Sequence, residues 1–362
     1  MAELVEQEPD LLVTKVDVDG QNVTAVAFPG MVAAIKEGDE VVLNTTGIDL
    51  DLGTGGIAFI LWNLSNSDLP TRGRGHVVKL RYTPWQTEVL TAEAPESPHH
   101  ESLREATSIH GTPVVVCGVH SQLGPVAAGI KEANPAARVG YLMTDGAALP
   151  LPWSNLVRSL KDAGLLEVTC TSGHSFGGDL EAVNVFSGLA ALRNAAGVDA
   201  IVIAMGPGVV GTGTALGFTA MEQGPLLDVA GTLGGRPFAC LRISFVDERA
   251  RHRGISHHCL TALRLGTQRR CTIAVPELLD DQARVVAGQL EDAGLTERHA
   301  VVEATGVEAV RRAVEAGIPL QSMGRKLEDN PEFFVAAGAA GALAGRATLA
   351  ESSDRLEEGE RT

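Results

Sequence analysis

The chain has 362 residues, of which 45 are acidic and 29 basic, and its formal net charge is −16. This balance argues against nucleic acid and against an anionic membrane surface as partners, because both attract a positive field. No apolar run reaches the roughly 18 residues of a membrane span, and the acidic N-terminus lacks the basic and apolar regions of a signal peptide. Five scattered cysteines without a Cys-x-x-Cys pair are typical of reduced thiols, so we expect a cytoplasmic protein.

The N-terminal quarter of the chain has a β pattern. We expect residues 1–10 to be an acidic tail, and residues 11–90 contain five short apolar runs with glycine turns between them. These runs predict a small, barrel-like β domain. Residues 91–111 are polar and contain prolines, so we expect a linker. The β domain could serve in recognition or oligomerisation, which leaves a homo-oligomer open.

The segment 112–348 has a different rhythm. Seven apolar runs alternate with helical patterns at 122–134, 153–164, 179–195, 214–231, 256–266, 279–293 and 306–316. Parallel strands need crossover helices, and strands that are apolar on both faces must be covered on both. The pattern therefore predicts an α/β domain, a doubly wound and mostly parallel sheet with helices on both faces. Residues 349–362 are charged, and we expect a disordered acidic tail.

Unusual polar residues follow the first five of these runs, in the loops 118–122, 144–146, 171–179, 206–214 and 247–258. Ligands of open α/β sheets bind outside the carboxyl ends of the strands. We therefore expect these loops to form one polar site. The loops that lead into the strands contain fewer unusual polar residues, which favours a single functional edge of the sheet.

Four of the same segments carry a family resemblance: TSGHSFGGDLEAVN, MGPGVVGTGTALGF, ISFVDERARHRGISHH and SMGRKLEDNPEFFVAAGAAG. Together they resemble the bacterial family catalogued as domain of unknown function 3866. The resemblance covers most of the chain, including the N-terminal GDEVVLNTT and GTGG segments. It implies membership of that family and no particular activity.

The residues Gly206, Gly208 and Gly211 match the G-x-G-x-x-G pattern of dinucleotide sites. They lie on the fourth strand–helix unit, and no acidic residue ends the next strand about 20 positions later. We therefore do not expect NAD(P). A turn that holds an anion at a helix N-terminus, with Thr212 and Gly213, fits the pattern better than a dinucleotide site. A glycine turn that only packs tightly remains open.

The stretch Gly173 to Gly177 spells G-x-S-x-G, the pattern of a hydrolase nucleophile elbow at Ser175. Asp247 followed by His257 or His258 would complete the order of a catalytic triad. An oxyanion-hole motif of the HGGG type is missing before Ser175, so the set is incomplete. A Ser175-dependent hydrolase is thus one of the alternatives.

Between Asp247 and Arg270 six arginines stand against two acidic residues. Arg249, Arg251 and Arg253 could clamp a phosphate or carboxylate. Internal ion pairs to acidic loops, for example to Asp145, are the structural alternative.

Two adjacent histidines follow Ser256, a good helix N-cap, where the helix dipole favours the neutral ring. Adjacent helical residues point about 100° apart, so we expect only one of His257 and His258 to face the site. A divalent metal ion is a further option, with His120, His174 and His252 as candidate ligands.

The leading hypothesis is an enzyme that acts on a small anionic metabolite, for which a phosphorylated compound is one option. Its candidate catalytic residues are His174, Asp179, Glu181, His257 and His258, with Glu222 weaker. Its candidate anion-binding residues are Gly206, Gly208, Gly211, Thr212, Gly213, His120, Asp145, Asn184, Arg249, Arg251 and Arg253. A non-catalytic module that binds a metabolite and regulates is the other alternative.

Overall fold

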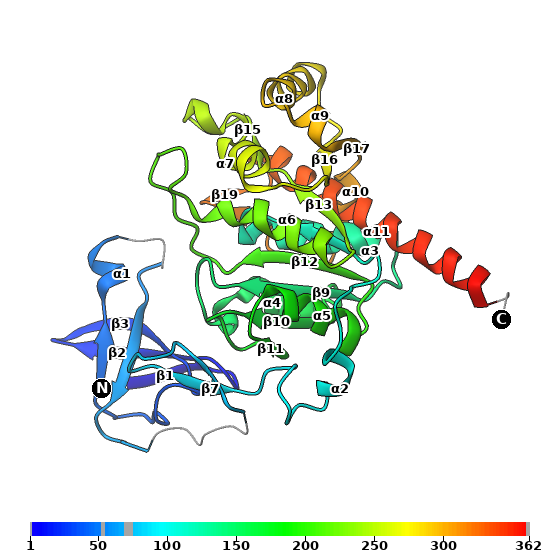
Figure 1. Ribbon diagram of the computed structural model, residues 1–362. Coiled ribbons are helices and arrows are strands. Elements are labelled where there is room, and N and C mark those ends of the chain that lie inside the picture. Colours follow the sequence, from blue (N-terminus) through cyan, green and yellow to red (C-terminus); the bar gives the residue numbers. More distant parts are fainter. Residues whose placement is uncertain (1, 52–54, 69–74, 360–362) are drawn as a thin grey trace. The chain divides into compact units, whose positions relative to one another are not determined.

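The computed structural model describes residues 2–51, 55–68 and 75–359, and the chain divides into two compact units, Met1–Leu90 and Thr91–Thr362. Figure 1 shows the helices and strands of each unit. Gly53 and Thr54 of the GTGG segment, and the last three residues of the expected acidic tail, lie outside the described residues.

The N-terminal unit is built on a five-stranded sheet with the strand order β1-β2-β3-β5-β4. Its strands are β1 (Ala2–Gln7), β2 (Leu12–Val18), β3 (Gln21–Ala27), β4 (Val41–Asn44) and β5 (Ala58–Asn63). A short helix, α1 (Thr46–Asp49), and the hairpin of β6 (Val77–Lys79) and β7 (Thr87–Val89) complete it. Among the described residues no pairing joins the edge strands β1 and β4, so the sheet is open and the barrel-like expectation is not met.

The turn between β2 and β3 follows from its sequence. Asp19 has φ = 52° and Gly20 has φ = 83°, the left-handed pair that a two-residue hairpin requires. The expectation that residues 1–10 form a tail is wrong for β1, which pairs with β2 from Ala2 to Gln7. Backbone hydrogen bonding suffices for such an edge strand, whose Leu4 and Val5 stay exposed.

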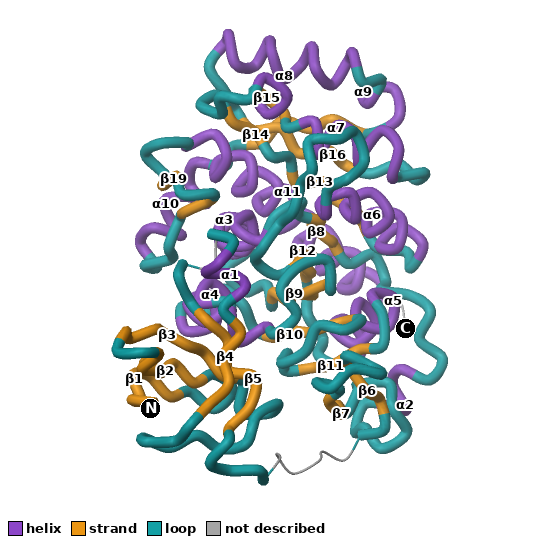
Figure 2. Tube along the Cα trace, turned by 90° about the vertical axis from the view of Figure 1, so that its left-hand side faces the viewer, coloured by secondary structure: helices purple, strands orange, loops and turns teal. Residues whose placement is uncertain are grey.

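The second unit confirms the α/β prediction. Eight strands, all paired in parallel, have the order β11-β10-β9-β12-β8-β13-β16-β17 (Figure 2). Their bounds are β8 (Pro113–Val116), β9 (Val139–Thr144), β10 (Val168–Ser172), β11 (Leu180–Ala182), β12 (Ala200–Met205), β13 (Arg236–Cys240), β16 (Thr272–Pro276) and β17 (Ala300–Ala304). Seven of them coincide with the predicted apolar runs, and β11 is additional.

Helices cover both faces of this sheet (Figure 2). In β12, Ala200, Val202 and Ala204 face one apolar core, whereas Ile201 and Ile203 face the other. The first core holds α3 (Leu123–Ala133), α4 (Asn155–Asp162), α10 (Val307–Glu315) and α11 (Pro331–Gly359). The second holds α5 (Val185–Ala190), α6 (Gln223–Thr232), α7 (His257–Thr261), α8 (Asp280–Asp292) and α9 (Leu295–Arg298).

The helix α11 lies backbone to backbone against α3. A Cβ atom on Gly129 or Gly341 would collide with a carbonyl group of the other helix, which explains the glycines in both segments. The helix continues to Gly359, into the segment 349–362 for which we expected a charged tail. No helix in the described part of the chain is both long and apolar enough to cross a membrane.

Residues 91–111, expected as a linker, belong to the second unit. They contain α2 (His100–Leu103), and Ala92 packs with Leu103 against Ala190 and Ala191 at the end of α5. Ile109 is fully buried in the second core. These apolar residues have no regular spacing, which is why the segment looked like a linker.

Candidate functional site

Two buried glutamines hold the carboxyl ends of β8 and β13 together. The Gln223 amide donates to the carbonyl oxygens of Val116 and Cys240, at 2.8 Å each. The Gln122 amide donates to the carbonyl oxygen of Leu241 at 2.9 Å. The loop that follows β13, residues 241–256, is therefore anchored at a fixed position beside the loop that follows β8. It is called the β13 loop below.

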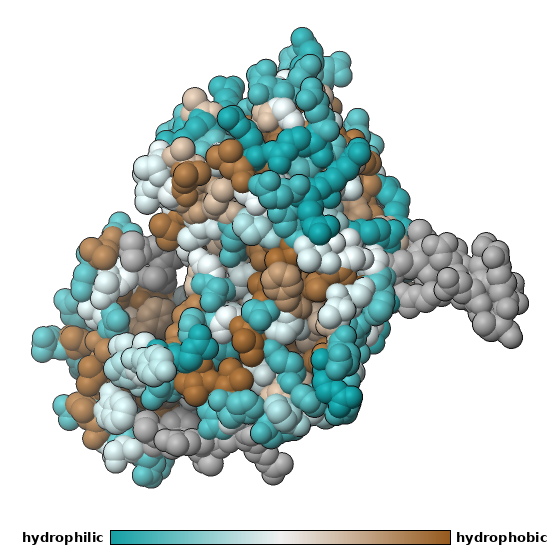
Figure 3. All heavy atoms as spheres, in the orientation of Figure 1, coloured by the Kyte–Doolittle hydropathy of each residue, from teal (hydrophilic) through white to brown (hydrophobic). Residues whose placement is uncertain are grey.

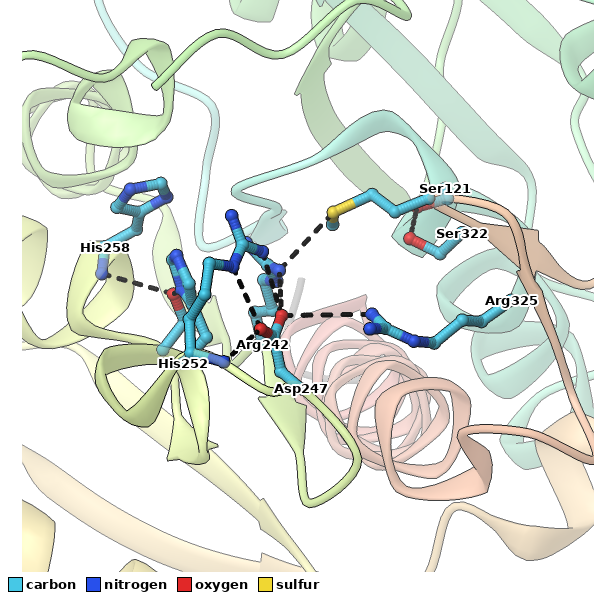
Figure 4. Close-up of polar contacts among 10 residues, drawn as sticks. Ser121, Arg242, Asp247, His252, His258, Ser322 and Arg325 are labelled. Atoms are coloured by element: carbon cyan, nitrogen blue, oxygen red, sulfur yellow. Dashed lines mark hydrogen bonds and ion pairs between the residues drawn. The ribbon is translucent and has the colours of Figure 1, made fainter. Parts of the chain in front are cut away.

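The β13 loop is organised around the buried carboxylate of Asp247, which lies between His252 and Arg325 in Figure 4. Arg249 donates to both carboxylate oxygens at 2.9 Å, and Arg242 lies 3.5 Å away. Arg325 approaches to 3.8 Å. The hydrogen bonds from Arg249 hold the pKa of Asp247 well below its usual range. Three arginines share one carboxylate, so the cluster has an excess of positive charge.

Arg325 comes from a distant part of the sequence. It lies on the hairpin of β18 (Gln321–Ser322) and β19 (Arg325–Lys326), which is fastened to the β8 loop because Ser121 donates to Ser322 at 2.8 Å. Arg242 directly follows an apolar strand, and its one signal in the sequence was a charge inside the run FACLRISF. Sequence reasoning did not single out Arg242 as a site residue.

The three arginines predicted to clamp an anion, Arg249, Arg251 and Arg253, differ in their surroundings. Arg249 is the partner of Asp247, as the structural alternative required, although with a different acid than expected. Arg251 is exposed and forms no ion pair within the described residues, and its Nη2 lies 3.8 Å from where a Cβ on Gly213 would stand. Arg253 is also exposed, but it is not among the arginines whose charge lowers the pKa of His257.

Three histidines gather beside this cluster. His252, His257 and His258 each offer a ring nitrogen, and these nitrogens lie within 4.8 Å of one another. The expectation that only one of the adjacent histidines faces the site is wrong, since the centroids of their rings are 4.3 Å apart. Because α7 begins at His257, the first residue of the pair lies at the very start of the helix, next to the β13 loop.

Burial and positive neighbours keep these rings neutral. Burial, followed by the charges of Arg242 and Arg249, lowers the pKa of His252 to about 4. Burial and the neighbouring histidines lower the pKa of His258 to about 3. Within the described residues, His257 Nε2 and His258 Nδ1 are buried without a hydrogen-bond partner. An unpaired buried polar atom costs about 1–3 kcal/mol, so the arrangement is expensive unless a ligand completes it.

The glycine loop, residues 206–218, lies over the histidines, but it does not begin a helix. Gly211 pairs with Phe218, and the Thr212 hydroxyl bonds inside the loop to Gly217. The helix α6 starts only at Gln223, after the short helix η4 (Thr219–Glu222). The predicted anion turn at a helix N-terminus is therefore wrong, because the loop closes as a hairpin.

The same loop fixes the His258 ring. Phe218 stacks on it with centroids 4.0 Å apart and an interplanar angle of 11°. A Cβ on Gly211 would stand 3.3 Å from His258 Cε1. Gly206 and Gly208 lie at the other end of the loop. A Cβ on Gly206 would collide with the Ala148 carbonyl, so this glycine has a packing role.

Ser175 lacks the geometry of a nucleophile. Its side chain is fully buried, and its hydroxyl is within hydrogen-bond distance of the carbonyl oxygens of Ser172 at 2.7 Å and Met143 at 3.1 Å. A nucleophile must be exposed and must contact a base. The G-x-S-x-G pattern is here a tight turn whose serine closes on its own backbone.

Asp179, Glu181 and Asn184 were expected along one helix, and this is wrong because Leu180–Ala182 is the edge strand β11. Asp179 lies where β11 begins, at the opposite end from the carboxyl edge, and forms an ion pair of 2.6 Å with Lys161. Glu181 accepts from Thr171 at 2.7 Å. Asn184 is the N-cap of α5. All three have structural partners.

Asn184 also lines a shallow apolar pocket with Leu103, Phe186 and Leu233. Figure 3 shows apolar side chains at the surface of the second unit in the region of α5 and α6. This pocket contains none of the other predicted site residues.

His120 and His174 do not join His252. His120 is held by Ser154 at 2.7 Å and by the Met205 carbonyl at 3.1 Å, and burial lowers its pKa to about 4. The backbone of His174 donates to Asp145 at 3.0 Å. The three histidines proposed from the sequence are therefore not brought together, whereas His252, His257 and His258 are.

Glu222 is more unusual than the sequence indicated. Burial raises its pKa to about 7, against the lowering effect of a 2.7 Å hydrogen bond from Thr144. A Cβ on Gly146 would stand 2.6 Å from its carboxylate, so the loop after β9 lies directly against it. A carboxyl group that titrates near neutral pH is suited to acid–base chemistry.

A family model described as protein of unknown function (DUF3866) matches residues 24–341. No curated protein and no solved structure matches the chain significantly.

Proposed function

Because the chain belongs to the DUF3866 family, whose description states no activity, we propose its function from the site itself: an enzyme that acts on a small anionic metabolite. The observation that carries the proposal is the excess of arginines around Asp247. Arg251 of the same loop is exposed and without an acidic partner among the described residues, and its charge helps to lower the pKa of His257. Guanidinium groups bind phosphate and carboxylate through paired hydrogen bonds.

Acid–base groups near the carboxyl edge support catalysis rather than binding alone. The neutral ring nitrogens of the histidines can bind a metal ion, and Glu222 can exchange a proton near pH 7. The five cysteines are buried thiols outside any disulfide, which supports a cytoplasmic location. The net charge of −16 speaks for a small ligand rather than nucleic acid.

The proposal is tested with a panel of phosphorylated and carboxylated metabolites. Thermal unfolding is measured with each compound for the wild type, for Arg251→Gln and for the control Arg284→Gln, an exposed arginine on α8. We expect at least one anion to raise the Tm of the wild type and of the control more than that of Arg251→Gln. NMR of the incubated mixture then tests turnover, and binding without turnover in any mixture favours the regulatory module.

A further inference from the structure

The three histidines have the geometry of a ligand set rather than of a packed core. Their ring nitrogens lie within 4.8 Å of one another. His252 is 2% exposed and His258 is 8% exposed, so both side chains are more than nine-tenths buried. His257 Nε2 and His258 Nδ1 are without hydrogen-bond partners in the described part of the chain. Buried imidazoles that serve only packing normally have their nitrogens bonded.

Ser256 contacts two of the three histidines and orients them. Its Oγ accepts from the His258 backbone N–H at 3.3 Å and lies 2.8 Å from His252 Nδ1. If Nδ1 of His252 carries the proton and donates to Ser256, Nε2 keeps a free electron pair. This is the tautomer that a metal-binding histidine adopts when a neighbouring group fixes its ring.

We propose that His252, His257 and His258 bind a divalent transition metal ion, with Zn²⁺ as the best match. Imidazole nitrogens suit Zn²⁺, and three protein ligands leave a fourth position for water or substrate. In a tetrahedral site with Zn–N bonds of about 2.0–2.1 Å the nitrogens stand roughly 3.4 Å apart, so small side-chain rotations close the present spacing. Asp247 is occupied by arginines and does not supply the fourth ligand.

The role of the ion rests on the proposed function, although its binding does not. A cation at these histidines, which lie within range of the charges of Arg249 and Arg251, adds to the positive field that receives the anion. The ion can polarise a substrate oxygen or acidify a bound water. The metal site thereby narrows the reaction class to metal-assisted chemistry on an anionic substrate.

The test uses the full chain without a histidine tag, stripped with a chelator and titrated with Co²⁺ and Zn²⁺. We expect about one equivalent of metal per chain, visible Co²⁺ absorption bands that Zn²⁺ abolishes, and X-ray absorption of the Zn²⁺ form that shows imidazole nitrogens at about 2.0 Å. His257→Gln and His258→Gln should bind about 100-fold more weakly, and Ser256→Ala about 10-fold more weakly. His110→Asn, an exposed histidine with φ = 50° that asparagine tolerates, is the control.

A wild type without stoichiometric metal overturns the proposal, as do folded His257→Gln and His258→Gln variants with wild-type affinity. X-ray absorption of the wild type decides the case even if the variants fail to fold. Anion binding measured with and without the metal separates the two proposals. Arg251-dependent binding in a protein that takes up no metal removes only the metal site, and metal uptake without anion binding removes only the proposed function.

Discussion

The carboxylate of Asp247 receives two hydrogen bonds of 2.9 Å from the guanidinium group of Arg249, one on each oxygen. The carboxylate is 2% exposed, whereas the arginine is half exposed. The pair therefore fixes the β13 loop from a buried anchor and leaves the face of the arginine open to solvent.

Replacing this anchor should be costly. Asp247→Asn leaves three arginines without their shared counter-charge, and we expect a loss of about 3 kcal/mol in the free energy of unfolding, because breaking a buried ion pair strands charge. Urea denaturation at pH 7.5 measures it. Asp281→Asn, which breaks an exposed Asp–Arg pair on α8, is the matched control and should change little. Equal effects of the two substitutions would contradict the anchor role.

The histidine cluster predicts a pH dependence of stability. The pKa values of His252 and His258 are about 4 and 3 in the folded chain, below the usual 6.5 of an unfolded one. Their contribution is therefore complete above pH 6.5 and is lost as the pH falls toward 4. In the presence of a chelator, the wild type should lose on the order of 1 kcal/mol more than His258→Gln between pH 7 and pH 5. Parallel pH profiles for the two proteins argue against neutral buried rings.

Glu222 should make the free energy of unfolding depend on pH in the opposite direction. Its pKa of about 7 exceeds the 4.5 of an ordinary glutamate. The stability that its protonated form contributes is complete below pH 4.5 and is lost as the pH rises through 7. Glu222→Gln should therefore gain stability over the wild type between these pH values and keep an advantage of about 2 kcal/mol at pH 8.5. Thermal unfolding at pH 5 and pH 8.5 measures the gain, and a difference that is independent of pH excludes the raised pKa.

Ser175 should be chemically inert. The wild type should not react with a fluorophosphonate probe, since the hydroxyl is buried near two backbone carbonyl groups. Ser175→Ala should cost about 1 kcal/mol of stability through the lost hydrogen bond and leave any turnover unchanged. Stoichiometric labelling that Ser175→Ala abolishes would restore the hydrolase hypothesis.

The sequence predicts the sheet well because each buried parallel strand must be apolar on both faces. It predicts the β13 loop as a site because arginines and histidines gather there after a strand. It fails at the start of the helix predicted over 179–195, where Leu180–Ala182 pairs with β10, whereas the helix itself begins only at Val185.

The order of the strands in the sheet could not be predicted from the single sequence. His174 follows β10, which is separated from β13 by β9, β12 and β8. At about 4.8 Å per strand the two ends stand roughly 19 Å apart, so His174 and His252 do not form one metal site. The ligands come instead from one loop and the helix that it enters, where local geometry alone brings His252 to His257.

Arg251 is the residue through which we expect the β13 loop to bind a small anion. The most direct measurement is isothermal titration calorimetry of the most stabilising anion of the panel with the wild type, Arg251→Gln and Arg284→Gln. A charged hydrogen bond contributes about 1.5–3 kcal/mol, so Arg251→Gln should bind at least about 10-fold more weakly and Arg284→Gln as tightly as the wild type. Equal affinity of all three proteins, or no anion that binds the wild type, would contradict the account.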